Sequence, residues 1–445
     1  MNTTGTSSLT VPLPRKRIMT DVADHRFIRK LIWVYFLLLL FEGALRKWFL
    51  PSLSQGLLIV RDPIVIWIYY LAYAQGIFPL ENKYLQRLFK WTMVSIVLSF
   101  LVNQAHPYAI AYGARTNLLH IPLIFIMGRI LKWKDVINFG KAFLWLAFPM
   151  TWVVAEQFQA DHTNILNVAA GGTGHQLMTS GDKVRASGTF SFVSGIVFYY
   201  CFTVAFIIYG FIQKNTFHKG LLYLGTGATF FAMVTAGSRA VIAESLQVIA
   251  CFGFLAYLRP QEFRKIAATV FGFSAIALLL YSQINPWVDI FKQGIGFMDL
   301  RFEEAANVEG TPLEAYYKRY WDIITAPYAY AQFTDFWGRG LGTATRAGSM
   351  LSGQLAFAEI SWSRPIIENG FLVGILFVLW RIWITKDLMK ICINCIKSNY
   401  YLPIFLFGAA GPVLLFSPLG QPTNLGFAAF GSGLCLASAL AKKPT

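Results

Sequence analysis

The stretch "FSFVSGIVFYYCFTVAFIIYGFI" (190–212) contains no charged residue. About 20 consecutive apolar residues are enough for a helix to cross the hydrocarbon core of a bilayer. Comparable apolar runs recur along the chain, some of them short and several interrupted by Gly or Pro. They lie near 31–49, 56–74, 89–104, 109–128, 136–157, 190–212, 220–236, 240–258, 266–283, 366–384, 400–419 and 423–440. We therefore expect an all-α polytopic membrane protein with about 12 transmembrane helices.

The composition of the whole chain supports the membrane class. Of 445 residues, 56% are hydrophobic and 13% are charged, whereas soluble domains carry about 25% charged residues. The formal net charge is +16. In a soluble protein this charge would indicate nucleic-acid binding, but in a polytopic membrane protein basic residues gather on the cytoplasmic side. We expect a lipid bilayer, and no nucleic acid, as a partner.

Lys and Arg residues orient the chain in the membrane. If the basic tail is cytoplasmic, every segment on that side carries at least two Lys or Arg, as the orientation rule requires. Both termini are then cytoplasmic, and the long polar stretch from Ser282 to Pro365 lies outside. The predicted segments are a cytoplasmic tail (1–30), transmembrane helices 1–9 (31–283), a large, partly helical outer loop (284–365), transmembrane helices 10–12 (366–440) and a cytoplasmic tail (441–445).

Ten arginines on the outer side are not explained by this rule. They are Arg46, Arg61, Arg115, Arg185, Arg239, Arg301, Arg319, Arg339, Arg346 and Arg364. Arg61 adjoins Asp62, and Arg46 lies four residues after Glu42, so structural ion pairs explain these two as well as a site does. The planar guanidinium fork matches phosphate oxygens bidentately. A ring of such side chains suits a bilayer-anchored diphosphate.

Two of these arginines lie where an outer loop meets a helix. In "GDKVRASGTFSF" (181–192), Arg185 precedes a turn that suits the presentation of backbone N–H groups to an anion, although a helix cap alone explains the pattern. In "TAGSRAVIAESL" (235–246), Arg239 occupies the first turn of a helix and opposes the helix dipole. An anionic ligand at that helix start would reverse the penalty, so we favour a functional role for Arg239.

The outer loop contains "EAYYKRYWDIITAPYAYAQFTDFWGRGLGTATRAG" (314–348). Within it, 316–324 is predicted to form an amphipathic helix that has Tyr317, Trp321 and Ile324 on one face and Arg319 beside them. Such a helix can lie on the bilayer through its aromatic residues and still present Arg319 to a lipid headgroup.

The end of the loop, "AEISWSRPIIENGFLVG" (358–374), combines carboxylates, an arginine and an aromatic residue. Glu359 is a candidate general base for a sugar hydroxyl, and Trp362 is a candidate platform for the sugar ring. Alternatively, both acids simply pair with arginines such as Arg364. For Glu368, in the first turn of the next helix, this structural role is the better explanation.

The remaining motifs indicate no cofactor. The Gly-rich "GRGLGTATRAG" (338–348) lacks a strand-to-helix context, so we expect a flexible turn near a glycan and no nucleotide-binding loop. The five cysteines lie in or beside apolar runs, and an odd number argues against a disulfide framework. No constellation of Asp, Glu and His indicates a metal ion. We expect neither metal nor cofactor.

The order of these motifs resembles the O-antigen ligase and O-antigen polymerase superfamily of bacterial membrane glycosyltransferases. The motif R-x-x-GTF corresponds to 185–190, and T-G-S-R to 235–239. An Arg shortly before a Trp corresponds to Arg319 and Trp321, and G-x-G-x-G to 338–342. The motif E-x-G-x-x-G corresponds to 368–374. By its spacing from this last motif, the family's catalytic His falls at Glu359, and the Pro-Asn usual after GTF is absent.

The resemblance implies transfer of an undecaprenyl-diphosphate-linked glycan to a glycan acceptor at the periplasmic face of the inner membrane, without metal or cofactor. Arg239 and Arg319 would hold the diphosphate, and Glu359 would take the acceptor proton, with inversion at the sugar. Substrate-binding residues would be Arg185, Arg364, Trp362, Trp321, Tyr317 and Arg346. A flippase and a chain-length regulator are the protein partners that this role would involve.

Three alternatives stay open. A ligase differs from a polymerase only in its acceptor, which would be lipid A core or protein; we favour the polymerase. A lipid-linked sugar flippase or secondary transporter would also have about twelve helices, although internal repeats and charges near the membrane midplane are more typical of that class. A structural scaffold would not need the arginines.

Overall fold

The computed structural model describes residues 25–172, 174–176, 183–258, 260, 287–332, 336–345, 348 and 361–441. Over these ranges the chain is helical, and its one bridge of the β type joins Val168 and His175. The α-helices are α1 (Arg26–Ala44), α2 (Ser54–Leu57), α3 (Asp62–Ala74), α4 (Lys83–Leu101), α5 (Pro107–Leu118), α6 (Pro122–Ile130), α7 (Trp133–Gln159), α8 (Val193–Ile212), α9 (Lys219–Thr235), α10 (Arg239–Leu258), α12 (Trp287–Glu309), α13 (Pro312–Gln332), α15 (Ser363–Lys397), α16 (Leu402–Phe416) and α17 (Pro422–Leu440). A π-helix η1 (Leu45–Phe49) and 3-10 helices η2 (Pro51–Leu53) and η3 (Ile165–Asn167) complete them.

Seven helical segments of the described chain are long and apolar enough to cross a membrane. They are Pro51–Ala74, Pro107–Ile130, Trp133–Gln159, Val193–Ile212, Arg239–Leu258, Ser363–Lys397 and Pro422–Leu440. The all-helical membrane class is thus confirmed, but the count of twelve is not. Helices α9 and α16 coincide with expected spans yet have 17 and 15 residues, and α1 and α4 carry several basic residues in their first turns. The expected span at 266–283 lies outside the described residues.

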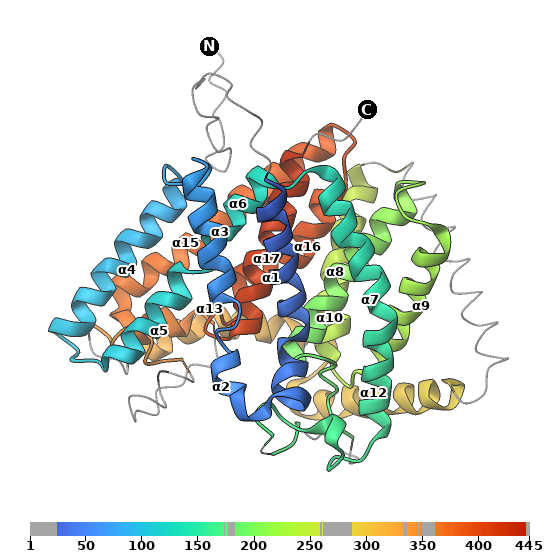
Figure 1. Ribbon diagram of the computed structural model, residues 1–445. Coiled ribbons are helices and arrows are strands. Elements are labelled where there is room, and N and C mark those ends of the chain that lie inside the picture. Colours follow the sequence, from blue (N-terminus) through green and yellow to red (C-terminus); the bar gives the residue numbers. More distant parts are fainter. Residues whose placement is uncertain are drawn as a thin grey trace.

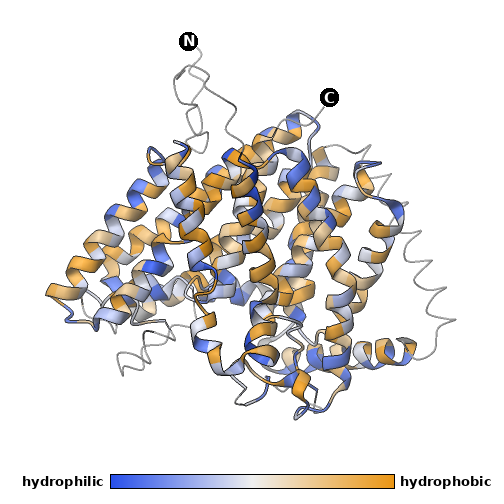
Figure 2. Ribbon diagram, in the orientation of Figure 1, coloured by the Kyte–Doolittle hydropathy of each residue, from blue (hydrophilic) through white to orange (hydrophobic). Residues whose placement is uncertain are grey.

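The helices form a bundle around α16 and α17, which lie at its centre in Figure 1. Helix α17 packs against α6, α8 and α16, and α16 packs against α8, α10 and α15. Helix α1 begins, and α17 ends, at the upper end of the bundle, whereas α12 runs across its lower end (Figure 1). Hydrophobic residues follow the lengths of the helices, and hydrophilic residues are more frequent at the two ends and on α12 (Figure 2).

Small residues bring the central helices close together. A Cβ at Gly433 of α17 would lie 2.7 Å from the Met127 sulfur, and a Cβ at Gly128 of α6 would lie 2.9 Å from Leu436. Between apolar helices in a membrane, close packing of this kind stabilises association because lipid tails are as apolar as the side chains. The glycines of α17 therefore explain how it can pack on several neighbours at once.

Helix α15 is broken near its beginning. Gly370 has φ 70° and ψ 173°, so the helical turns on either side of it are not continuous. The break leaves the carbonyls of Ile367 and Glu368 without helical partners, and they accept hydrogen bonds from the backbone N–H groups of Arg339 (2.8 Å) and Gly340 (2.9 Å). Irregular backbone inside a membrane protein needs such internal partners.

The segment 338–345, which supplies these N–H groups, is packed within the protein. Leu341 to Thr345 are buried, and the Leu341 N–H donates to the Ser99 hydroxyl at 2.7 Å. At Gly342, where φ is +84°, a Cβ would lie 1.9 Å from the Ala109 carbonyl oxygen. The expectation of a flexible turn was therefore wrong over these residues: the glycines are needed for close backbone contact with α5 and α15.

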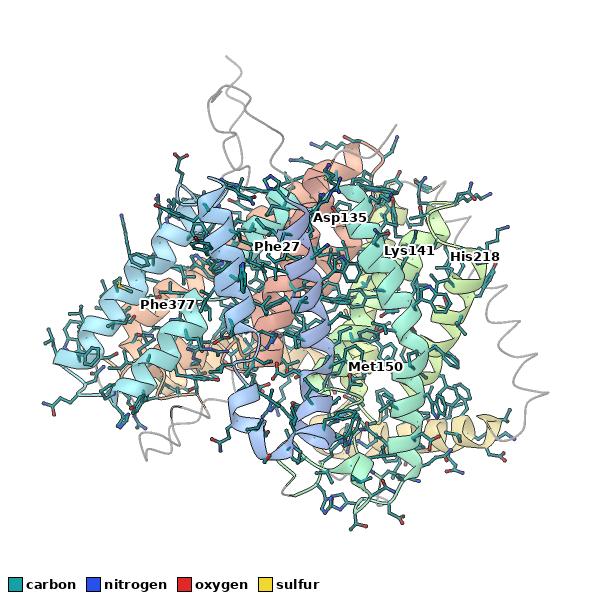
Figure 3. The ribbon with its side chains drawn as sticks, viewed as in Figure 1. Phe27, Asp135, Lys141, Met150, His218 and Phe377 are labelled. Carbon is teal, nitrogen blue, oxygen red and sulfur yellow. The ribbon has the colours of Figure 1, made fainter. Side chains whose placement is uncertain are left out.

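The predicted helix at 316–324 is confirmed as part of α13, and Tyr317, Trp321 and Ile324 are all exposed on it. Helix α12 precedes it in the stretch 284–365 that we expected to be partly helical. Asp135 and His218 lie near the beginnings of α7 and α9, at the end of the bundle away from α12 (Figure 3).

Candidate functional site

Three arginines from distant parts of the sequence are near enough for the charges of two of them to act on the third. Arg185 belongs to the segment between α7 and α8, Arg239 begins α10, and Arg301 lies on α12. The charges of Arg301 and Arg239 act directly on Arg185: after burial, they are the main causes that hold the pKa of Arg185 below its ordinary value. We call these three residues the arginine triad. The sequence predicted Arg185 and Arg239 as site residues, and the structure adds Arg301.

Close packing on Gly237 brings the triad together. Gly237 has φ +62°, and a Cβ there would lie 2.9 Å from the Phe297 ring of α12 and 3.3 Å from the Val184 carbonyl oxygen. Phe297 in turn contacts Phe158 of α7 edge to face, with ring centroids 5.6 Å apart. Helix α12, which carries Arg301, therefore lies across two segments. One is the α9–α10 turn, which ends at Arg239, and the other is the 183–188 segment, which contains Arg185.

The 183–188 segment is also anchored to η1, the π-helix that follows α1. The Lys47 ammonium, which is buried, donates to the Ser187 hydroxyl (3.0 Å) and to the Gly188 carbonyl (2.6 Å). The Gly188 N–H donates to Gln157 of α7 at 2.8 Å. These contacts fix the backbone three residues after Arg185, and so limit where its side chain can lie.

The triad has more donors than the described residues satisfy. Arg301 Nη1 donates to Glu304 at 2.9 Å, and Glu304 is the carboxylate that acts on Arg185 as well. The Nε groups of Arg185 and Arg301 are buried and have no hydrogen-bond partner among the described residues. Buried polar groups are normally paired, and like charges in contact repel. An anion with several oxygens would satisfy both requirements.

Arg319, on α13, lies close enough to Glu244 of α10 for their charges to interact. The next residue, Tyr320, accepts a hydrogen bond from Gln247 of α10, and its ring packs edge to face on Phe416. On the exposed side of α13, the rings of Tyr317 and Trp321 stack with centroids 6.0 Å apart. Helix α13 is thus attached to the bundle by one side and presents two stacked aromatic rings on the other.

At the start of α15, Arg364 forms a buried ion pair with Glu368, from Nε to Oε1 at 2.9 Å. The structural role that we expected for Glu368 is the one observed. The Trp362 indole donates to the Leu415 carbonyl at 2.7 Å, stacks on Phe416 and is 8% exposed. Its ring is therefore held by protein contacts. Glu359 and Arg346, the other predicted site residues, lie outside the described residues.

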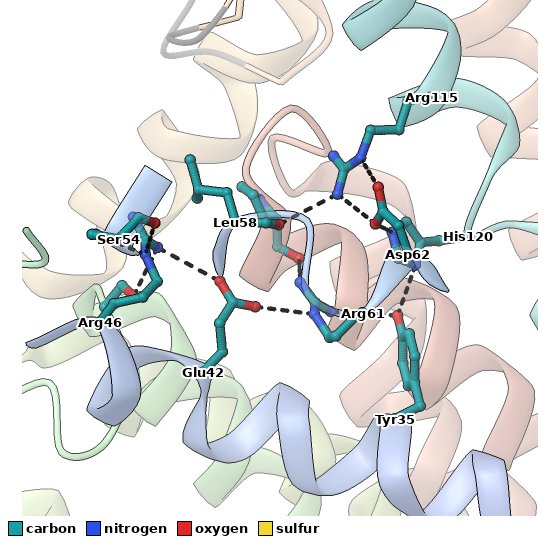
Figure 4. A network of polar contacts seen from close by, with 11 residues as sticks. Tyr35, Glu42, Arg46, Ser54, Leu58, Arg61, Asp62, Arg115 and His120 are labelled. Atoms are coloured by element: carbon teal, nitrogen blue, oxygen red, sulfur yellow. Dashed lines mark hydrogen bonds and ion pairs between the residues drawn. The ribbon is translucent and has the colours of Figure 1, made fainter. Parts of the chain in front are cut away.

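A second set of charged residues forms a buried network near the ends of α1 and α5 (Figure 4). Glu42 pairs with Arg61 at 3.1 Å and with Arg46 at 3.6 Å. Asp62 accepts from Arg115 Nη2 at 2.7 Å and lies 3.2 Å from the His120 ring, which lies 3.1 Å from the Tyr35 hydroxyl. Three of the ten unexplained arginines are therefore held by carboxylates of the chain itself.

Within the described ranges, His, Cys, Asp and Glu side chains form no group of three that could hold a metal ion. No protein-family model matches the sequence, and no curated protein is significantly similar to it. The geometry of the site therefore carries the functional argument.

Proposed function

We propose that this protein is a polymerase-type glycosyltransferase that joins undecaprenyl-diphosphate-linked oligosaccharide repeat units at the periplasmic face of the bacterial inner membrane. One observation carries the proposal. The arginine triad gathers three guanidinium groups at one end of a membrane-type helical bundle, and the buried Nε groups of Arg185 and Arg301 have no hydrogen-bond partner among the described residues. A diphosphate carries the charge and the oxygens that such a cluster needs.

The reaction is a displacement at the anomeric carbon of the donor sugar. The acceptor hydroxyl forms the new glycosidic bond while the bond from the anomeric carbon to the lipid diphosphate breaks, with inversion of configuration. The negative charge that develops on the leaving diphosphate is stabilised by Arg185, Arg239 and Arg301, as fixed donors stabilise developing charge in other enzymes. The acceptor proton passes to a base, for which we propose Glu359.

Arg319, Tyr317 and Trp321 supply the remaining contacts of the proposed site. Helix α13 packs against α10 and α15, so that Arg319 can join the arginines that hold the donor. The stacked rings of Tyr317 and Trp321 form an exposed aromatic surface, which suits a sugar chain or the membrane interface. Arg346 is assigned a secondary role in binding, whereas Trp362 and Arg364 are buried and held by contacts within the protein, so we assign to them the positioning of the start of α15.

The membrane arrangement in this proposal has about 12 spans, cytoplasmic termini and a periplasmic site. It is supported by the position of α12 and the triad at the end of the bundle opposite the beginning of α1 and the end of α17 (Figure 1). Basic residues on the tail and the inner loops then face the cytoplasm. A ligase, in which lipid A core or protein is the acceptor, would use the same donor site.

A transporter of lipid-linked sugars is the second candidate. Two observations favour it: the break of α15 at Gly370 and the buried ionic network around Glu42 and Asp62. Discontinuous helices and charged residues at depth are typical of secondary transporters.

A reconstituted turnover assay separates the two candidates. Purified protein in liposomes is given lipid-diphosphate-linked repeat units, and products are sized without added nucleotide sugar. The transferase gives products longer than one unit, which Arg239→Ala and Arg301→Ala abolish and Lys292→Ala, a control on the same helix as Arg301, does not. Movement of single units between leaflets without elongation would contradict the proposal and support the transporter.

A further inference from the structure

A small cavity lies at the beginning of α15, separate from the arginine triad. It has a volume of about 50 Å³ and lies among α4, α5, α15 and the turn before α17. Its polar lining consists chiefly of Asn117, Ser361, Arg364, Glu368, Asn369 and Arg381. None of these residues belongs to the segments that carry the triad. The break at Gly370 keeps this part of α15 apart from the rest of the helix and so shapes one side of the cavity.

The described lining carries one more positive charge than negative charge. Arg364 is paired with Glu368. Arg381 donates to the Leu414 carbonyl (2.8 Å), the Ser417 carbonyl (2.7 Å) and the Ser361 hydroxyl (2.6 Å), all of which are neutral. The two guanidinium groups are near enough to repel each other. Arg381 is 5% exposed and Glu368 is 1% exposed, so water screens this excess charge poorly.

The remaining polar groups limit what can bind. Arg364 Nη2 donates a long hydrogen bond to Asn117 Oδ1, at 3.4 Å. The guanidinium group can therefore donate to another acceptor as well. Asn369 is 3% exposed, and its side-chain oxygen has no partner although it borders the cavity. This oxygen can accept from one water molecule. The lining therefore offers donors for an anion and one acceptor for a water beside it.

The volume restricts the anion further. A protein cavity of about 150 Å³ holds one benzene molecule. A cavity of about 50 Å³ therefore has room for one monatomic ion or one carboxylate group. A diphosphate or a whole sugar ring is too large, so of an acidic sugar only the carboxylate group enters the cavity.

We propose that this cavity binds one compact monoanionic group, a carboxylate or a halide, between Arg364 and Arg381. Two sources share this chemistry: a free small anion, and the carboxylate of an acidic sugar in a bound glycan. Binding places a negative charge where Arg381 has only neutral partners. It thereby stabilises the junction between the broken start of α15 and the end of α16.

The test measures thermal unfolding of the detergent-solubilised protein, purified without halide or carboxylate buffers. Sodium chloride, bromide, formate or glucuronate is titrated at constant ionic strength against sodium 2-(N-morpholino)ethanesulfonate, whose sulfonate group is larger than a carboxylate group. A saturable rise in the unfolding midpoint is expected with at least one of the four salts and not with the sulfonate. A rise with chloride or formate alone identifies a free small anion, whereas a rise with glucuronate identifies the sugar carboxylate.

Substitutions test whether the response of the unfolding midpoint to salt arises at this cavity. Replacing the ion pair by apolar residues (Arg364→Met with Glu368→Leu) removes the Arg364 donors without leaving a buried charge unpaired, so the fold is retained. The salt concentration at half effect is expected to rise about tenfold or more, because a hydrogen bond to a charged group is lost. Arg129→Gln on α6, which donates to the Ile77 carbonyl and does not line the cavity, keeps the wild-type response.

Three results would overturn the proposal. One is an unfolding midpoint of the wild type that responds to none of the four salts. Another is an equal response to the bulky sulfonate, which would show a general salt effect. The third is a response that the paired substitution at Arg364 and Glu368 leaves unchanged. None of these measurements depends on glycosyltransferase turnover, so they are independent of the proposed function.

Discussion

The Arg61 guanidinium pairs with Glu42, from Nε to Oε2 at 3.1 Å, and leaves the neighbouring Asp62 to Arg115 and His120. Arg61 also donates to the Pro422 carbonyl at 2.7 Å, which ties α1 and α3 to the beginning of α17. Its side chain is 1% exposed. The pair thus connects three helices at a point where the backbone between α1 and α3 is irregular.

Breaking this pair should destabilise the fold. Glu42→Gln leaves the buried Arg61 charge without its closest carboxylate, and loss of one partner of a buried ion pair typically costs about 3–5 kcal/mol. We expect a large fall in the unfolding midpoint of the detergent-solubilised protein. The more exposed pair between Arg29 and Asp135, at 3.4 Å, provides the matched control: Asp135→Asn should cost about 0–1 kcal/mol. Equal effects of the two substitutions would contradict the buried network.

Gly342→Ala should disrupt the packing of the 338–345 segment. The substitution requires φ +84° of an alanine, and its Cβ would meet the Ala109 carbonyl oxygen at 1.9 Å. The backbone strain alone costs about 1–2 kcal/mol, and the collision adds to it. Gly227→Ala on α9 is the control, since a Cβ there meets nothing within 4 Å, and it should stabilise the helix by about 0.5–1 kcal/mol. Thermal unfolding measures both, and an unchanged midpoint for Gly342→Ala would show that the segment is loosely held.

Arg185→Gln should separate stability from activity. Its charge is opposed by Arg239 and Arg301, so removing it relieves repulsion, and the unfolding midpoint should stay the same or rise. If the triad stabilises the leaving diphosphate, turnover should fall about 100-fold to 1,000-fold, as it does on removal of one charge-stabilising donor in other enzymes. Elongation rates and unfolding midpoints measured on the same preparations test both parts. A loss of stability parallel to the loss of activity would indicate a structural role.

The proposed orientation can be tested with single cysteines in a variant from which the five native cysteines are removed. Asp289 and Lys134 are both exposed. Asp289 lies near the beginning of α12, which runs across the lower end of the bundle (Figure 1), and Lys134 lies beside Asp135 at the other end (Figure 3). In spheroplasts, a membrane-impermeant maleimide should label Asp289→Cys directly, and should label Lys134→Cys only after the membrane is permeabilised. The reverse pattern would place the arginine triad on the cytoplasmic side and contradict the proposed periplasmic site.

The membrane class follows from the amino-acid sequence alone, because long apolar runs are a property of consecutive residues and need no knowledge of contacts. Seven expected spans correspond to helices that are long and apolar enough to cross a membrane. The count of twelve is not confirmed: α9 and α16 have 17 and 15 residues, α1 and α4 carry basic residues near their beginnings, and 266–283 lies outside the described residues. The helix around Tyr317 and Trp321 was predictable for the same local reason: its apolar residues repeat with the helical period.

The pairing of the charged residues, in contrast, depends on how distant helices pack. Adjacency suggested that Arg61 pairs with Asp62, yet helix geometry places Glu42 of α1 against Arg61, and Arg115 of α5 against Asp62. Arg301 joins Arg185 and Arg239 because α12 packs on Gly237, a contact between residues far apart in the sequence. The 338–345 segment resembles a flexible turn in composition, but its glycines serve close backbone packing against α5 and α15. Local pattern determines which helices form, whereas packing between distant segments determines which charged side chains come near one another.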